Sequence, residues 1–156
     1  DPAVAFIHDL DKGFIIDANS YLHDSASAVT ASAAGTVNSV AQVLDVGNGY
    51  FDGKVCLDFS AMASHITDQL YRFQVQGSTD GAMATANVYD LAEKRFGAGE
   101  VLASGTSAKD VGAAGERHFI PFENRIGDTP MPYIRIYLSL SGTSPSVTYK
   151  AALSKG

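Results

Sequence analysis

The clearest indication of the fold class is Leu70-Tyr71-Arg72-Phe73-Gln74-Val75-Gln76, which is followed by Gly77-Ser78-Thr79-Asp80-Gly81. Its large apolar residues alternate with polar residues, which is the pattern of a β-strand with one buried face. The glycine-, serine- and aspartate-containing residues that follow are typical of a turn. The stretch therefore predicts a half-buried strand that ends in a tight connection.

Two other segments show the same alternation. Residues 133–140 follow prolines at positions 130 and 132, which set the start of a strand, and residues 55–59 form a shorter example. The side chains that this alternation directs toward a core are Val55, Leu57, Phe59, Tyr71, Phe73, Val75, Ile134, Ile136, Leu138 and Leu140. Weaker strands are expected at residues 14–17, 40–46, 85–91, 101–104, 118–122 and 147–153, and a single helical turn at residues 91–95.

The composition favours an all-β domain. The chain has 156 residues, of which 46% are hydrophobic and 18% charged, with 15 glycines and no tryptophan. Asp, Gly and Ser favour turns, whereas the helix formers Glu, Lys and Arg are scarce. About eight short strands separated by turn residues are typical of a β-sandwich.

The charge balance argues against two classes of partner. The formal net charge is −6 at pH 7, whereas nucleic acids and anionic membranes attract basic surfaces. The sequence also has no apolar run that approaches the roughly 20 residues of a membrane-spanning helix. We therefore expect neither a nucleic acid nor a membrane as a partner.

The first part of the chain differs in composition from the rest. Residues 25–39 are mostly Ala, Ser, Thr and Gly, as in a linker. We therefore predict an N-terminal arm over residues 1–35 and a compact domain over residues 36–156. Large apolar side chains in the arm are unfavourable in water, so the arm either packs on its own domain or docks on another molecule. These side chains are Val4, Phe6, Ile7, Phe14, Ile15 and Ile16.

The sequence lacks the motifs of catalysis and metal binding. The histidines at positions 8, 23, 65 and 118 are far apart, and no two are spaced as a pair of metal ligands on one strand. No Gly-x-Ser-x-Gly sequence marks a serine nucleophile. Cys56 lies between apolar residues on a predicted strand, which favours a packing role over a reactive thiol. We expect no catalytic residue, no metal site and no cofactor.

Tyr133, Arg135 and Tyr137 are predicted to share the outward face of the strand at residues 133–140. Tyr and Arg are enriched at protein interfaces, so this face suits a partner protein. Exposed aromatic rings also stack against sugars, although Trp is absent from this chain. A protein and a carbohydrate both remain candidates for the partner of this face.

The succession of segments in the second half has a parallel in a known family. The segments are residues 70–81, Arg117-His118-Phe119-Ile120-Pro121-Phe122, Pro132-Tyr133-Ile134-Arg135-Ile136-Tyr137-Leu138 and residues 147–153. Residues 24–32 and the strand expected near residues 43–47 come before them in the same order. This succession resembles the small cement, or decoration, proteins on the capsids of tailed double-stranded DNA phages. The resemblance covers roughly residues 17–154, and the residues before it look like an extra extension.

The resemblance implies a jelly roll of two antiparallel sheets with a structural function. Such a protein binds the outside of the assembled phage head, bridges subunits of the major capsid protein and is often a dimer or trimer, with the dimer favoured. It is not an enzyme, and it is made in the host cytoplasm before it joins the virion. The residues expected to contact the capsid are Phe6, Ile7, Phe14 and Ile15 of the arm, together with Tyr133, Arg135 and Tyr137. The alternative is a carbohydrate-binding jelly-roll module on a virion or a secreted protein.

Overall fold

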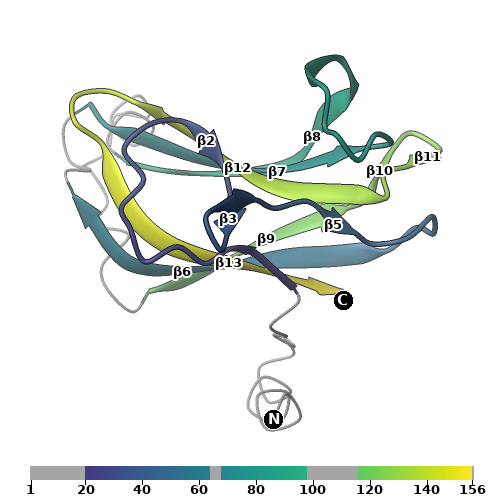
Figure 1. Cartoon of the computed structure of the whole chain (residues 1–156), viewed down its shortest axis with the longest axis horizontal. Coiled ribbons are helices and arrows are strands. Elements are labelled where there is room, and N and C mark those ends of the chain that lie inside the picture. The colour runs from purple at the N-terminus through teal and green to yellow at the C-terminus, as the bar shows by residue number, and fades with distance from the viewer. Residues whose placement is uncertain (1–19, 64–67, 98–115, 156) are drawn as a thin grey trace, which may run out of the picture.

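The structure is a computed structural model that describes residues 20–63, 68–97 and 116–155 (Figure 1). Regular structure in these residues is β-strand, apart from Ser20 and the short turn η2 (Thr85–Asn87), which have 3-10 geometry. The predicted all-β class is therefore confirmed. The strands expected at residues 14–17 and 101–104 lie outside the described residues.

One sheet, called sheet A, is antiparallel and has the order β1-β13-β6-β9. Its two long central strands pair along most of their length, from Ser146 opposite Ala63 to Lys155 opposite Gly53, with one register shift at Thr148/Tyr149. The strands of sheet A are β1 (Tyr21–His23), β6 (Asp52–Ala63), β9 (Arg117–Glu123) and β13 (Ser146–Lys155).

The other sheet, called sheet B, has the order β2-β12-β7-β8, and β5 pairs with the same edge of β12 as an extension of β2. All of these pairs are antiparallel. The strands of sheet B are β2 (Ala33–Ala34), β5 (Leu44–Asp45), β7 (Leu70–Ser78), β8 (Val88–Phe96) and β12 (Tyr133–Ser141). Two short hairpins complete the fold: β3 (Thr36–Val37) with β4 (Val40–Ala41), and β10 (Arg125–Ile126) with β11 (Thr129–Pro130).

The two sheets pack face to face as a β-sandwich around one apolar core (Figure 1). Both sheets contribute large side chains with almost no exposed surface, and aromatic rings join them. The Phe73 ring of sheet B lies 5.5 Å from Phe59 and 5.0 Å from Tyr149 of sheet A, measured between ring centroids. Such tilted and edge-on pairs stabilise a core beyond the area they bury.

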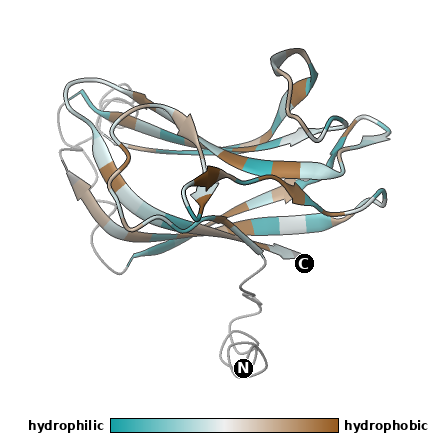
Figure 2. Cartoon of the chain, viewed as in Figure 1, coloured by the Kyte–Doolittle hydropathy of each residue, from teal (hydrophilic) through white to brown (hydrophobic). Residues whose placement is uncertain are grey.

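The alternation in the sequence matches the burial in the structure. Val55, Leu57, Tyr71, Phe73, Val75, Ile134, Ile136 and Leu138 are 0% exposed, and Phe59 is 2% exposed. Leu140 is partly buried against the same core. Figure 2 shows the result as alternating hydrophobic and hydrophilic bands along the strands.

Residues 91–95, expected to form a helical turn, belong instead to strand β8. Helix propensity is a weak local preference that tertiary pairing overrides. Here β8 pairs with β7 over its whole length, and Leu91 and Ala92 pack against the core. Two other expected strands differ in extent. The strand expected at residues 40–46 is replaced by two short strands, and the first three residues of the strand expected at 85–91 form the 3-10 turn.

Residues 20–35, the end of the predicted arm, pack on the two sheets. Strand β1 pairs with β13, and its Leu22 is 0% exposed in the core. Strand β2 pairs with β12 at Ala33 and Ala34. Small residues in this stretch allow the chain to lie close to the sheets. The same composition is typical of a linker, although here the chain contributes edge strands. The arm residues 1–19 lie outside the described residues.

Gly35 is needed for this close approach. A Cβ atom at this position would lie 2.2 Å from the Leu22 carbonyl oxygen and 2.4 Å from Ile136 Cγ2. We expect Gly35→Ala to lower the free energy of unfolding by about 1–3 kcal/mol, because a buried backbone must shift. Urea denaturation measures this loss.

The matched control is Gly49→Ala. A Cβ atom at Gly49 would meet no heavy atom within 4 Å, so the stability should stay within about 0.5 kcal/mol of the parent. Equal stability of both variants would contradict the close packing of Gly35.

Candidate functional site

The described residues show no cluster of metal-binding side chains. Within residues 20–63, 68–97 and 116–155, no three His, Cys, Asp or Glu side chains are grouped so that they could hold a metal ion. The same residues include no helix with the length and hydropathy needed to cross a membrane. Cys56 is 1% exposed and packs beside Ala152, with Tyr21 and Phe119 against them.

His23 and Tyr149 form a buried pair of titratable rings. Their centroids are 4.2 Å apart in a stacked arrangement, and His23 Nδ1 accepts a hydrogen bond from the Thr36 N–H at 2.9 Å. His23 Nε2 and the Tyr149 hydroxyl have no hydrogen-bond partner among the described residues. Burial lowers the pKa of His23, although Asp24 opposes this, and burial raises the pKa of Tyr149.

The lowered pKa of His23 predicts that the folded protein loses stability as the pH decreases. Between the folded-state pKa and the ordinary value of 6.5, the unfolded chain binds the proton and the folded chain does not. Stability is therefore full above the ordinary value and is lost as the pH falls through this window. His23→Asn keeps an acceptor for Thr36 but cannot titrate. We expect this variant to lose less stability than the parent between about pH 7.5 and about pH 5.5 in urea titrations. If the stability of the parent and of the variant changed with pH in parallel, His23 would not be the source of this pH dependence.

The structure brings together three of the residues expected to bind a partner. Tyr133, Arg135 and Tyr137 lie on the outer face of β12, since the residues between them point into the core. The Arg135 guanidinium carbon lies 5.4 Å from the centroid of the Tyr137 ring, and Arg135 Nε donates to Gln76 Oε1 at 2.8 Å. The other four expected residues, Phe6, Ile7, Phe14 and Ile15, lie outside the described residues.

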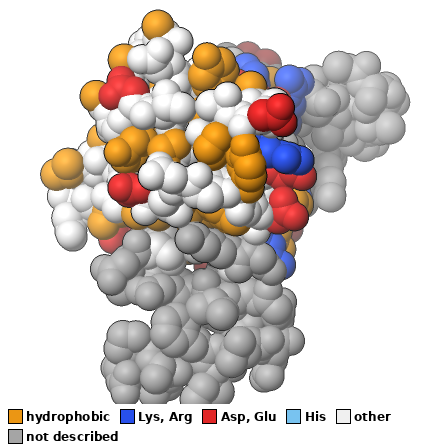
Figure 3. All heavy atoms as spheres, turned by 90° about the vertical axis from the view of Figure 1, so that its right-hand side faces the viewer, with side chains coloured by type: hydrophobic (Ala, Val, Ile, Leu, Met, Phe, Trp, Pro, Cys, Tyr) orange, Lys and Arg blue, Asp and Glu red, His pale blue; other side chains and the backbone are white. Residues whose placement is uncertain are grey.

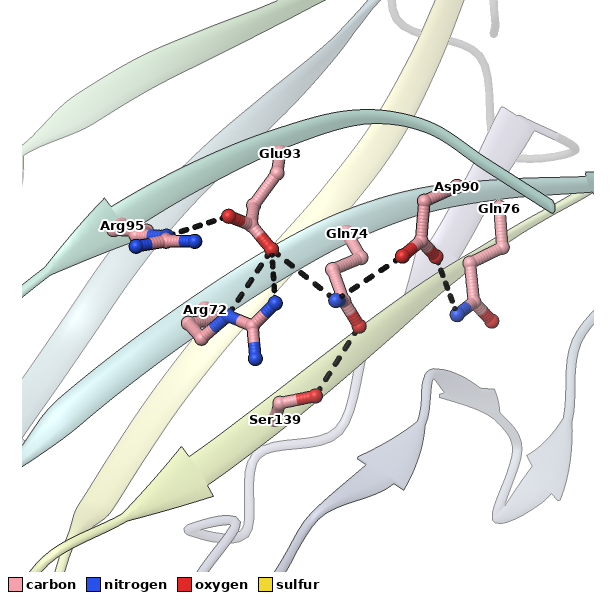
Figure 4. Close-up of polar contacts among 7 residues, drawn as sticks. All are labelled: Arg72, Gln74, Gln76, Asp90, Glu93, Arg95 and Ser139. Atoms are coloured by element: carbon pink, nitrogen blue, oxygen red, sulfur yellow. Dashed lines mark hydrogen bonds and ion pairs between the residues drawn. The ribbon is translucent and has the colours of Figure 1, made fainter.

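A polar network crosses the outer face of sheet B, from β12 through β7 to β8 (Figure 4). Gln76 Nε2 donates to Asp90 at 2.9 Å, and Gln74 Nε2 donates to Glu93 at 3.2 Å. Arg72 donates to Glu93 from both Nε and Nη2, at 3.1 and 2.7 Å. Each of these bonds joins neighbouring strands, so the network ties the side chains of this face to one arrangement.

Glu93 is the most highly bonded acid of the network. Burial alone would raise its pKa, but hydrogen bonds from Arg95, Arg72 and Gln74 outweigh this effect and lower the pKa. The carboxylate therefore stays ionised at neutral pH, and its bonds leave little capacity for a ligand. Any ligand of this face is expected at the opposite end of the network, near Arg135 and Asp90.

A cleft of about 420 Å³ lies at that end of the network. It falls within the roughly 300–1,000 Å³ of small-molecule sites. The 79–87 loop forms one wall, where Asp80 accepts hydrogen bonds from the N–H groups of Ala82 and Ala84 at 3.0 and 3.3 Å. These bonds lower the pKa of Asp80. The cleft is lined by Gln76, Thr85, Val88, Asp90, Arg135 and Tyr137.

Residues 46–51, 79–87 and 124–132 connect strands at one end of the sandwich, here called the loop end (Figure 1). Asn124 fixes part of it and is 0% exposed. Its Oδ1 accepts from the Phe51 N–H at 2.7 Å, and its Nδ2 donates to the Gly49 carbonyl at 2.9 Å. The Asn124 carbonyl accepts from the Met131 N–H at 2.7 Å. One buried side chain therefore joins two loops.

The loop end carries exposed apolar side chains (Figure 3). Tyr50, Tyr89 and Ile126 are 56%, 45% and 40% exposed, and β10 lies against β8. Tyr50 is held in place, because its hydroxyl donates to the Asp128 carbonyl and the Arg125 guanidinium lies 5.6 Å from its ring centroid. An exposed aromatic that is already immobilised is a favourable anchor for a partner protein.

Two surfaces of the described residues therefore stand out as functional candidates. The first is the polar face of sheet B with its cleft, and the second is the apolar loop end. The sequence indicated part of the first surface, through Arg135 and Tyr137, but not Gln76, Asp90 or the loop end. No protein-family model matches this chain, and a search of curated proteins finds no match.

Proposed function

We propose that this chain is a structural virion protein, a cement or decoration protein that binds the outside of an assembled phage head and bridges major capsid protein subunits. The observation that carries the proposal is the strand order, β1-β13-β6-β9 facing β2-β12-β7-β8. This order supports a jelly roll, the fold that the resemblance of the sequence implies. Jelly rolls of two Greek keys occur in viral capsid proteins and in lectins.

The path of the chain supports the jelly-roll designation. Strands β2 and β5 together occupy one edge of sheet B, and β7 and β8 form a hairpin within that sheet. All other connections between sheet strands pass from one sheet to the other. Because a fold alone does not define a function, the proposal also needs a surface that suits a capsid.

The loop end is the surface that we assign to capsid contact. It combines an immobilised Tyr50 with Arg125 and Ile126, and Tyr and Arg are the residues that most often dominate binding energy at interfaces. These residues come from connections between strands, which the rigid sandwich positions. The arm residues Phe6, Ile7, Phe14 and Ile15 remain a second predicted contact.

Decoration stabilises a head by mass action. A protein that binds the assembled lattice but not loosened subunits adds a free energy of RT ln(1 + [L]/Kd) at each site. This amounts to roughly 2.7 kcal/mol per site when the free protein is at about 100 times Kd. A homo-oligomer that holds two capsid subunits at once would bind more tightly still.

Ile126→Asp tests the assigned surface. A charge in the apolar loop end would be buried without a partner on the capsid, so we expect occupancy on heads to fall at least roughly tenfold. Occupancy is measured by co-sedimentation of the purified protein with heads stripped of it. The far-ultraviolet circular dichroism and the unfolding midpoint should stay unchanged, because Ile126 is already exposed.

The matched control is Val40→Asp. Val40 is 67% exposed in the β3–β4 hairpin, away from the loop end, so the same change there should leave occupancy intact. Full occupancy of the Ile126→Asp variant would show that the loop end does not contact the capsid. If both variants lost occupancy equally, the loss would follow from added charge rather than from the surface.

A further inference from the structure

We propose that the cleft between the 79–87 loop and the outer face of sheet B binds a neutral saccharide. This binding site shares only the 79–87 loop with the loop end, and saccharide binding goes beyond the decoration function. The proposal stands on the functional groups that the cleft presents, their arrangement and their free hydrogen-bonding capacity.

Arg135 supplies the donors. Its Nε atom is bonded to Gln76, and its two Nη atoms have no hydrogen-bond partner among the described residues. Its guanidinium lies over the Tyr137 ring. The contacts of Nε and the ring fix the plane of the guanidinium, so its free N–H groups have a set direction before a ligand arrives.

Asp90 supplies the acceptors in the same cleft. One of its oxygens accepts from Gln76 at 2.9 Å and the other from Gln74 at 3.5 Å. A carboxylate has about four lone-pair sites, so acceptor capacity remains on both oxygens. Gln76 thus connects the cationic Arg135 to the anionic Asp90 and keeps both in place.

This pairing of charges selects the class of ligand. An anion would gain from Arg135 but would be repelled by Asp90, and a cation would meet the opposite difficulty. A vicinal diol can accept from a guanidinium with one hydroxyl and donate to a carboxylate with the other. Neutral sugars carry such diols, whereas apolar ligands would leave both charged groups without partners.

The walls of the cleft suit a sugar ring. Val88 and the Tyr137 ring provide apolar surface for the C–H groups of a sugar, and the Thr85 hydroxyl lies on the loop side. Thr85 belongs to η2, the turn that closes the 79–87 loop, and the buried Met83 anchors this loop. The site is therefore built from a rigid sheet and a braced loop.

The test is an NMR titration of the purified, full chain with soluble oligosaccharides. The probes are short homo-oligomers of glucose, galactose, mannose and N-acetylglucosamine, each added to about 10 mM, so that affinities near 1 mM are detected. We expect at least one oligomer to shift the backbone amides of Gln76, Thr85, Val88 and Asp90 with saturation. If none of the oligomers shifted these amides, or if the shifts lay elsewhere, the proposal would be overturned.

A matched pair of variants assigns the binding energy. Arg135→Ala removes the free donors, so affinity for the shifting oligomer should fall roughly tenfold or more, as for a lost hydrogen bond to a charged group. Arg72→Ala removes the same charge from the same face, but Arg72 bonds to Glu93 outside the cleft, and affinity should be retained. Equal losses in both variants would indicate general electrostatics and would overturn the site. These measurements use the free protein, so they are independent of binding to heads.

Discussion

Phe73→Ala should lower the free energy of unfolding by about 3–5 kcal/mol, the range for a phenylalanine removed from a packed core. Phe73 is 0% exposed at the centre of the sandwich. Its ring contacts Phe59, Phe96 and Tyr149, with centroids 5.5, 5.7 and 5.0 Å away. The substitution therefore removes contacts with both sheets at once and leaves a cavity between them.

Urea denaturation followed by circular dichroism measures this effect as a lower midpoint at an unchanged slope. Tyr89→Ala is the control, because it also truncates an aromatic residue but at a position that is 45% exposed. We expect the control to change stability by less than about 1 kcal/mol. If the Phe73 variant lost no more than the control, the shared core would be wrong.

Asn124→Ala should produce the second large effect, a loss of about 2–4 kcal/mol. The substitution leaves the Phe51 N–H and the Gly49 carbonyl without the side-chain partners that they have at 2.7 and 2.9 Å. Each buried polar group without a partner costs about 1–3 kcal/mol. The effect should also be local. Relative to the parent, amide hydrogen exchange should accelerate at Phe51 more than in the centre of the sheets.

Asn48→Ala is the matched control for this effect, since Asn48 is exposed in the same connection. It should change neither stability nor exchange at Phe51. A stable Asn124 variant with unchanged exchange would show that the loop end is fixed by other contacts. The exchange readout separates loss of the Asn124 bonds from general unfolding, which would affect all amides alike.

The strands with a clear period of two could be predicted from the sequence because the signal is local. Side chains at alternate positions of a strand face opposite sides, so residues 70–76 and 133–138 already show which face is buried. Long-range pairing has no comparable local signal. Residues 91–95 contain Glu, Lys and Arg, which favour helix, and only the pairing of β8 with β7 makes them a strand.

The packing of residues 20–35 on the sheets also has no local signal in the sequence. Small residues at positions 25–39 indicate a linker, yet Gly35 is small because the chain passes within contact distance of Leu22 and Ile136. A low-complexity stretch and a tightly packed edge have the same composition. Only the positions of the neighbouring strands distinguish them.

The candidate sites could be predicted only in part. Arg135 and Tyr137 follow from the alternation in β12, but their partners Gln76 and Asp90 depend on the register of β12, β7 and β8. A register shift at Val75/Gln76 brings Asp90 opposite Gln76. Asn124 has no pattern around it that predicts burial, because its partners are backbone groups of a loop far away in the sequence.

Cryo-electron microscopy of intact phage particles that carry this chain is the measurement we would make first to test the proposal that it decorates a capsid. We expect density for the two-sheet sandwich at regular positions on the outside of the head, with the loop end and Tyr50 toward the junction of neighbouring major capsid subunits. Heads with no such density, from cells in which the chain is abundant and free in solution, would contradict it.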